Sequence, residues 1–160
     1  MQKTAQHLLD TLEKAKPFLM AISDMDAAQK PNPSKWSKKE ILGHLIDSAC
    51  NNQQKFVRTM AQARIDFVGY QQDDWVSLQH YQKSDWQDLI TFWLAYNRHL
   101  AHIIGTVSED FLTNTISIQG SEPFALAFIM EDYVEHLKHH LKVIIPEAKF
   151  VSKFSNVYNA

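Results

Sequence analysis

The stretch that decides the fold runs from residue 36 to residue 48 and reads Trp36-Ser37-Lys38-Lys39-Glu40-Ile41-Leu42-Gly43-His44-Leu45-Ile46-Asp47-Ser48. Ser37 followed three residues later by Glu40 is a capping box, in which two side chains satisfy two backbone N–H groups at a helix start. Apolar residues then recur at helical spacing, so the sequence predicts a long amphipathic helix over residues 38–60. His44 lies at the border of its apolar stripe and faces a groove between helices.

Three further segments show the same helical periodicity. Residues 4–22 form the first predicted helix. The third helix is predicted to begin at a cap on Ser84 and to end at Gly105. The fourth is predicted to be capped by Ser121 and to run to about Ile145, just before a proline. Four amphipathic helices, each with one apolar stripe, predict an all-α four-helix bundle.

The segments between these helices differ in length and composition. Residues 24–35 are predicted to be a loop, because they are rich in Asp, Asn and Pro. Residues 62–82 and 106–121 are long enough for crossovers, and loops of this length often cover a pocket. Part of the first, residues 73–78, is predicted to be a helical turn. The tail 147–160 is expected to pack on the bundle or on a dimer partner, through Phe150, Val151, Phe154, Val157 and Tyr158.

Composition excludes several classes of protein. The 160 residues predict one domain spanning 1–160. A net charge of -2 and the lack of a basic block argue against nucleic acid or an anionic membrane surface as partner. No apolar run approaches transmembrane length. The single Cys50 cannot form an internal disulfide, which favours a reducing, cytoplasmic location.

Three of the eight histidines lie within five positions near the end of the fourth helix. His136 and His140 are four residues apart and therefore share one face, an arrangement in which two imidazoles can hold one metal ion. His140 falls inside the apolar arc of the helix and His136 at its edge. His139 falls on the polar side and is expected to be solvated.

The histidines that face inward are therefore His44, His136 and His140, with His99 at a border as a reserve candidate. Three neutral imidazoles with an open coordination position are typical of a catalytic divalent-metal site. Histidines in a bundle core are also compatible with simple packing and hydrogen bonding. Spacing alone leaves both interpretations open.

Several of these residues resemble a known family. Residues 36–48 are similar to the second-helix motif W-S-x-x-E-x-L-x-H-L-x-D of the DinB/YfiT-like superfamily, and the similarity continues through Asn51–Arg58. Residues 68–76 resemble the tyrosine-containing segment of the YfiT-like branch. Residues 97–100 resemble its third helix, and residues 135–140 supply its terminal H-x-x-x-H. The resemblance covers most of the chain from residue 35 to residue 145.

The resemblance implies a bundle in up-down-down-up order, often a homodimer, with a divalent metal that is commonly nickel or zinc. Carried over by motif position, the ligands are His44, His136 and His140. Characterised relatives include thiol-dependent transferases and isomerases that use bacillithiol, mycothiol or glutathione. The sequence therefore predicts a metal-dependent enzyme for a small-molecule substrate, such as a thiol-dependent S-transferase or a related transferase or hydrolase.

Other side chains are candidates for supporting roles at this site. Asp132, one turn before His136, is a candidate to orient an imidazole. Asp47, one turn after His44, points somewhat away from the core and is interpreted as a surface charge rather than as a partner of a metal ligand. Further residues are predicted to line the site or contact substrate: Asn51, Tyr70, Arg98 and His99. Two alternatives stay open, namely a non-enzymatic metal-binding or dimerisation module with a stress-related role, and a bundle whose histidines merely pack.

Overall fold

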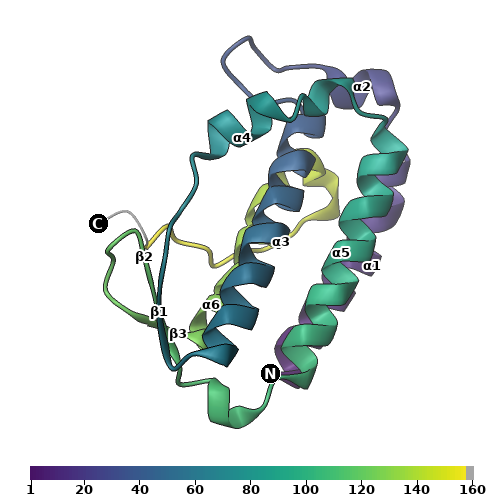
Figure 1. Ribbon diagram of the computed structural model, residues 1–160. Coiled ribbons are helices and arrows are strands. Elements are labelled where there is room, and N and C mark those ends of the chain that lie inside the picture. Colours follow the sequence, from purple (N-terminus) through teal and green to yellow (C-terminus); the bar gives the residue numbers. More distant parts are fainter. Residues whose placement is uncertain (158–160) are drawn as a thin grey trace.

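A computed structural model of the chain describes residues 1–157. Four long helices make up the bundle in Figure 1, and they are α1 (Gln2–Met20), α3 (Lys38–Ala61), α5 (Trp86–Thr106) and α6 (Leu126–Ile144). The predicted four-helix architecture is confirmed. Helix α3 begins at the predicted capping box, because Ser37 N donates to Glu40 Oε2 at 2.8 Å and Glu40 N donates to Ser37 Oγ at 3.2 Å.

The helix order is up-down-down-up, as the resemblance implied. In Figure 1, α1 and α6 run upward, whereas α3 and α5 both run downward. A hydrogen bond from Lys39 Nζ to the Ser84 carbonyl, 2.7 Å long, joins the starts of the two parallel helices. Helices α5 and α6 each pack against both α1 and α3. Parallel neighbours require a crossover as long as the bundle, which explains the long connection between α3 and α5.

The connections contain more structure than the sequence predicted. Their elements are α2 (Asp24–Ala28), β1 (Arg64–Phe67), α4 (Gln72–Leu78), β2 (Thr115–Ile118), β3 (Phe124–Ala125) and three 3-10 helices at Tyr81–Lys83, Glu109–Phe111 and Pro146–Ala148. Strand β1 pairs in parallel with β2, and β2 pairs antiparallel with β3. This small sheet ties the two crossovers together, and it was not predicted. The helical turn predicted at residues 73–78 is confirmed as α4.

Two predicted helix starts are wrong. Helix α5 is capped by Asp85, whose side chain accepts from Asp88 N at 3.0 Å, rather than by Ser84. Helix α6 begins at Leu126, because residues 124–125 are taken by β3. Ser121 instead closes a turn by accepting from Ile118 N at 3.0 Å. The predicted loop 24–35 begins with the short helix α2, capped by the hydroxyl of Ser23.

Part of the described tail packs on the bundle, whereas Val151 and Val157, which were also expected to pack, are exposed. Phe150 is buried, with the ammonium of Lys14 from α1 at 4.7 Å from its ring centroid. Ser152 Oγ donates to the Glu135 carbonyl at 2.7 Å, and Phe154 N donates to Ser152 Oγ at 3.0 Å. These contacts anchor the tail beside α6. Tyr158, also named in the sequence prediction, lies outside the described residues.

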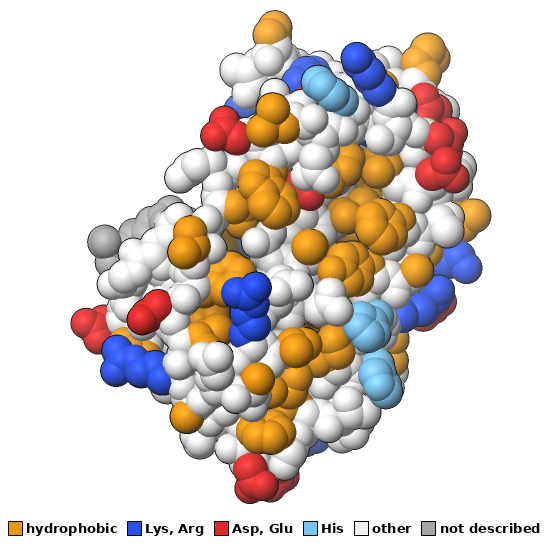
Figure 2. Space-filling model, viewed as in Figure 1, with side chains coloured by type: hydrophobic (Ala, Val, Ile, Leu, Met, Phe, Trp, Pro, Cys, Tyr) orange, Lys and Arg blue, Asp and Glu red, His pale blue; other side chains and the backbone are white. Residues whose placement is uncertain are grey.

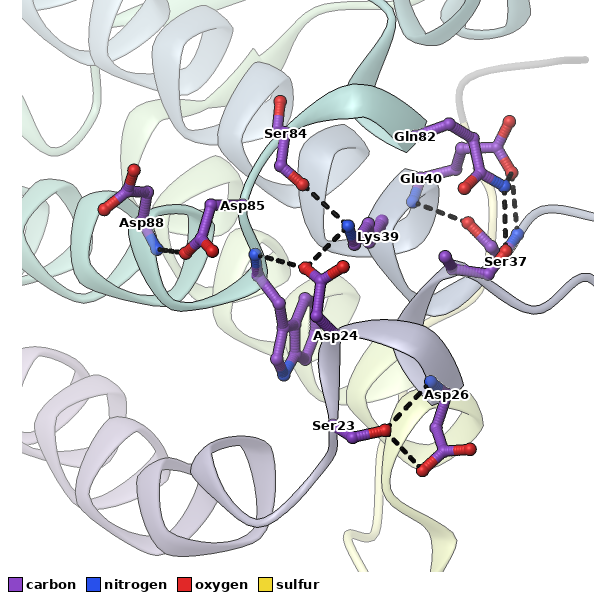
Figure 3. A network of polar contacts seen from close by, with 12 residues as sticks. Ser23, Asp24, Asp26, Ser37, Lys39, Glu40, Gln82, Ser84, Asp85 and Asp88 are labelled. Carbon is purple, nitrogen blue, oxygen red and sulfur yellow. Dashed lines mark hydrogen bonds and ion pairs between the residues drawn. The ribbon is translucent and has the colours of Figure 1, made fainter.

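A network of polar side chains fastens the starts of α3 and α5 (Figure 3). Lys39, buried, donates to Asp24 of α2 at 2.7 Å as well as to Ser84. Asp24 also accepts from Trp86 N at 3.0 Å, and this contact together with Lys39 lowers the pKa of its carboxyl. We call Asp24, Ser37, Lys39, Glu40 and Trp86 the cap network.

The outer face of α3 and α5 is partly apolar. Figure 2 shows hydrophobic side chains gathered on the face that these helices present, and the exposed hydrophobic residues include Val57 and Phe92. The homodimer implied by the resemblance stays a prediction. Within residues 1–157, no helix has both the length and the apolar character that crossing a membrane requires.

Candidate metal centre

The three inward-facing histidines converge between α3 and α6. The ring centroid of His44 lies 5.4 Å from that of His136 and 4.8 Å from that of His140, and the last two are 4.6 Å apart. One ring nitrogen from each residue lies within 4.8 Å of the others. The residues that helical spacing selected are therefore brought together, and they form a possible metal site.

Hydrogen bonding leaves part of this cluster unsatisfied. His44 is only 2% exposed, and neither of its ring nitrogens has a hydrogen-bond partner among the described residues. The Nε2 atoms of His136 and His140 lie 3.1 Å apart, so only one of them can carry a proton in that contact. The Ser48 hydroxyl lies 3.4 Å from His136 Nδ1, at the long end for a hydrogen bond.

All three imidazoles are held neutral at physiological pH. Burial, followed by the nearby His140, lowers the pKa of His44 to about 3. Burial, followed by the nearby His139, lowers the pKa of His140 to about 4. Burial and then the surrounding histidines hold the pKa of His136 well below its ordinary value. Neutral imidazole is the form that ligates a metal ion.

The donor set fits a divalent metal ion. A buried imidazole without any hydrogen bond is costly, and ligation by a cation would satisfy it. Two histidines that compete for one proton at His136 and His140 would both become acceptors toward a metal ion. Three neutral nitrogen ligands suit zinc, nickel, copper and iron alike, so the residues do not select the metal.

The cluster forms part of the wall of a cavity of about 620 Å³. Helix α3 contributes His44, Ser48, Asn52 and Lys55 to its lining. The crossover before α4 contributes Tyr70, and α6 contributes Asp132 together with His136 and His140. A volume of this size is typical of a site for a small molecule. The expectation that the long connection 62–82 covers a pocket is confirmed.

The supporting residues predicted from the sequence divide into two groups. Asp132 and Tyr70 line the cavity. Asn51 lies outside its lining, where its amide donates to the Asp47 carbonyl at 2.9 Å. Arg98 lies outside it as well, paired with Glu13 of α1 at 3.0 Å, and His99 Nε2 instead lies 3.2 Å from Gln53 Nε2 on the surface.

Several lining residues were missed, although a signal for them existed. Positions 44, 48, 52 and 55 follow one another at intervals of four, four and three residues, so they share one helix face. Asn52 faces the cavity and Asn51 does not, because one residue along a helix rotates a side chain by about 100°. The predicted exposure of His139 is confirmed, yet this residue also lies at the rim of the cavity.

Aromatic side chains shield the histidines on two sides. The ring of Trp36 lies 5.2 Å from that of His44, and the ring of Phe154 lies 4.9 Å from that of His136. Phe154 also lies 5.5 Å from His139. The tail that carries Phe154 is held by Glu135, which accepts from Lys153 N at 2.6 Å. The tail therefore forms one wall of the cavity, which sequence reasoning did not foresee.

Asp47, one turn after His44, is buried rather than a surface charge as its helix position suggested. Its Oδ1 accepts from Tyr81 and from Gln79, both at 2.7 Å. Tyr81 reaches it by packing directly on the backbone of α3 at Gly43, where a Cβ would lie 2.2 Å from the ring. Burial raises the pKa of the Asp47 carboxyl against the lowering effect of these two hydrogen bonds.

A comparison with protein-family models assigns the chain to a family. The family model described as the DinB superfamily matches residues 4–144. The chain belongs to the DinB superfamily. This confirms the resemblance carried by the second-helix motif and by the terminal histidine pair. A comparison with curated proteins gives no match.

A solved structure supports the same conclusion about the fold. The chain is similar to YfiT from Bacillus subtilis, with a TM-score of 0.81 and 18% sequence identity over 92% of this chain and 84% of that chain. That protein is described as having an unusual four-helix bundle topology. At this identity the likeness concerns the fold, which agrees with the up-down-down-up order of the helices seen here.

Proposed function

We propose that this DinB superfamily member is a divalent-metal-dependent enzyme that acts on a small molecule, as a thiol-dependent S-transferase. The observation that carries the proposal is the pair of unpartnered nitrogens on the buried His44 ring, facing His136 and His140 at a cavity wall. Buried polar groups without partners are rare in native structures, and they concentrate at sites that bind something.

The chain's own side chains would act in three ways. His44, His136 and His140 would hold the ion, and it supplies Lewis-acid chemistry that lowers the pKa of a thiol or water to give a nucleophile at neutral pH. Trp36 and Phe154 limit the access of water to the histidines. Polar side chains that line the cavity on α3 and α6, such as Asn52 and Asp132, would orient a substrate.

Metal analysis tests the first half of the proposal. We expect about one equivalent of nickel, zinc or another divalent ion per chain in the wild type, and almost none after His44→Ala. His102→Ala is the matched control, because His102 is exposed on α5 away from the cavity. Circular dichroism would show that both variants keep their helices. A metal content unchanged by His44→Ala would overturn the assignment.

Turnover tests the second half. The metal-loaded protein would be incubated with an electrophile and with glutathione, bacillithiol or mycothiol, and loss of free thiol would be followed. We expect saturable turnover that His136→Ala abolishes and His102→Ala preserves. Saturation with none of these thiols would exclude S-transfer by them.

A hydrolase is the second candidate, because the similar YfiT structure is described as a probable metal-dependent hydrolase. In that case water would take the place of the thiol, and the protein would cleave ester or amide substrates in the absence of any thiol. Metal bound at His44 without turnover of either kind would favour the third possibility, a non-enzymatic metal-binding or dimerisation module.

A further inference from the structure

The lining of the cavity also contains a pair of opposite charges outside the three-histidine cluster. Lys55 on α3 and Asp132 on α6 both line it, and both are partly buried. The ammonium of Lys55 lies 5.5 Å from the ring centroid of Phe67 on β1, which places it toward the sheet side of the cavity. The proposed metal chemistry gives Lys55 no role, and it gives Asp132 only the general role of orienting a substrate.

The two charges lie within electrostatic reach of each other, and Lys55 also lies within electrostatic reach of His136. Asp132 raises the pKa of Lys55, against a larger lowering by burial that brings the value to about 8. The positive charge of Lys55 in turn contributes to the lowered pKa of His136. Asp132 precedes His136 by one helical turn, which corresponds to about 6 Å along the axis of α6.

A ligand with a single charge would fit this pair poorly. A carboxylate placed against Lys55 would also meet the negative charge of Asp132, and an ammonium placed against Asp132 would meet the positive charge of Lys55. A group that carries both charges satisfies both residues, because its carboxylate contacts Lys55 and its ammonium contacts Asp132. The α-amino acid end of a small molecule has this arrangement.

We propose that Lys55 and Asp132 bind the zwitterionic, amino-acid-like end of the substrate, while its reacting end lies about one helical turn away at the three histidines. The inference rests on the proposed function, since it concerns the substrate class of the same cavity. The competing explanation is that the two residues form a purely structural ion pair between α3 and α6.

A matched series of four thiols tests the proposal. N-(γ-glutamyl)cysteamine carries both charges at one end, N-glutarylcysteamine only the carboxylate, N-(4-aminobutanoyl)cysteamine only the ammonium, and N-butanoylcysteamine neither. All four share the same thiol and spacer. Isothermal titration of each into the zinc-loaded protein measures what each charge contributes to affinity. We expect the zwitterion to bind about tenfold more tightly than each of the other three.

Two variants assign the contributions to residues. Lys55→Met should remove the advantage that the carboxylate gives and leave that of the ammonium, and Asp132→Asn should do the reverse. Lys142→Met is the charge control, since Lys142 is exposed on α6 outside the cavity lining. Equal affinities across the four ligands, tightest binding by the carboxylate-only ligand, or equal losses for all four in both variants would each overturn the proposal.

The same comparison without thiol or metal separates this proposal from the metal chemistry. The zwitterion γ-glutamylethylamide and the uncharged N-ethylbutanamide would be titrated into the metal-free protein. We expect the zwitterion to bind more tightly. If the protein holds no metal but keeps this preference, the proposed enzyme fails and the binding site stands. If the protein binds metal through His44 but shows no preference for the zwitterion in either series, the proposal for Lys55 and Asp132 is wrong and the metal assignment stands. Should either variant fail to fold, the wild-type series alone decides.

Discussion

Two sets of polar side chains in this bundle, nearly all of them buried, differ in how fully they form hydrogen bonds within the chain. In the cap network, Ser37 and Glu40 bond to each other, and Lys39 joins the starts of α3 and α5. In the interiors of α3 and α5, within residues 1–157, three residues have buried polar atoms without a hydrogen-bond partner. These atoms are both ring nitrogens of His44, Asp47 Oδ2 and Trp93 Nε1. We call His44, Asp47 and Trp93 the unpaired middle.

The difference indicates which polar groups serve folding and which serve binding. A satisfied network stabilises a single arrangement of helices, whereas an unsatisfied buried group costs about 1–3 kcal/mol. Stability is commonly lost at functional sites, and here the residue with two unpaired atoms, His44, also belongs to the histidine cluster. Substitution in the cap network should therefore lower stability, whereas substitution in the unpaired middle should cost less stability and, at His44, should remove metal binding.

Acidification should produce the largest effect on stability, and it should act through the cluster of His44, His136 and His140. An unfolded histidine has a pKa near 6.5, but in the folded chain the values are about 3 for His44 and about 4 for His140. Below pH 6.5 the unfolded chain therefore binds more protons, and the stability that these groups confer above that pH is lost as the pH falls. With His136, we expect a loss of about 3 kcal/mol between pH 6.5 and 5.5 in metal-free protein.

Urea unfolding at a series of pH values, with a chelator present, would measure this slope. His44→Leu should lower the pH slope of the unfolding free energy by an amount that corresponds to about one bound proton, because one titrating group with a lowered pKa is removed. His102→Leu serves as the control. A slope that His44→Leu leaves unchanged would show that the acid sensitivity arises elsewhere in the chain.

Two buried tryptophans provide the next test, with an expected difference of about 2 kcal/mol. Trp86 Nε1 donates to the Leu19 carbonyl at 3.0 Å, whereas Trp93 Nε1 has no hydrogen-bond partner within the described chain. Both rings are fully buried, so Trp→Phe removes similar volume at each position. Trp86→Phe should therefore destabilise the protein more than Trp93→Phe in thermal or urea unfolding. Equal losses would mean that pairing of the indole N–H does not distinguish the two regions.

Local patterns in the sequence predicted much of this molecule. The capping box at Ser37 and Glu40 involves residues three positions apart, and the selection of His136 and His140 needs only helix geometry. Such interactions are contained within one element, so a sequence can reveal them. His44, the third histidine of the possible metal site, was found the same way, from its place at the edge of an apolar stripe.

Contacts between distant segments could not be predicted in this manner. Strand β1 is four residues long and pairs with β2, with Arg64 opposite Thr115, so neither strand is recognisable without its partner. Asp47 was expected at the surface because nothing in α3 shows that Tyr81 will cover it. The tail reaches the histidines through Phe154, which depends on the folded position of α6.

Replacement of His44 should raise stability by about 1.5 kcal/mol in the metal-free protein. His44→Leu fills most of the same space and removes the two unpartnered nitrogens, and an apolar group of similar shape avoids their desolvation penalty. The same substitution should abolish metal binding. Urea unfolding with a chelator measures the gain, with His102→Leu for comparison. A destabilised His44→Leu protein would indicate that His44 is satisfied in solution without metal.

Two buried serines on α3 and at its start provide the finest comparison. Ser37→Ala removes the cap from Glu40 N and should cost about 1 kcal/mol of unfolding free energy, with no change in metal affinity. Ser48→Ala removes a hydroxyl 3.4 Å from His136 Nδ1 and should change stability little, while weakening metal binding about tenfold, because partners of ligand imidazoles tune their orientation and basicity. Urea unfolding and competition with a chelator measure the two effects in each variant. If Ser37→Ala weakened metal binding as much as Ser48→Ala, the cap network and the unpaired middle would be energetically coupled along α3 rather than separate in function.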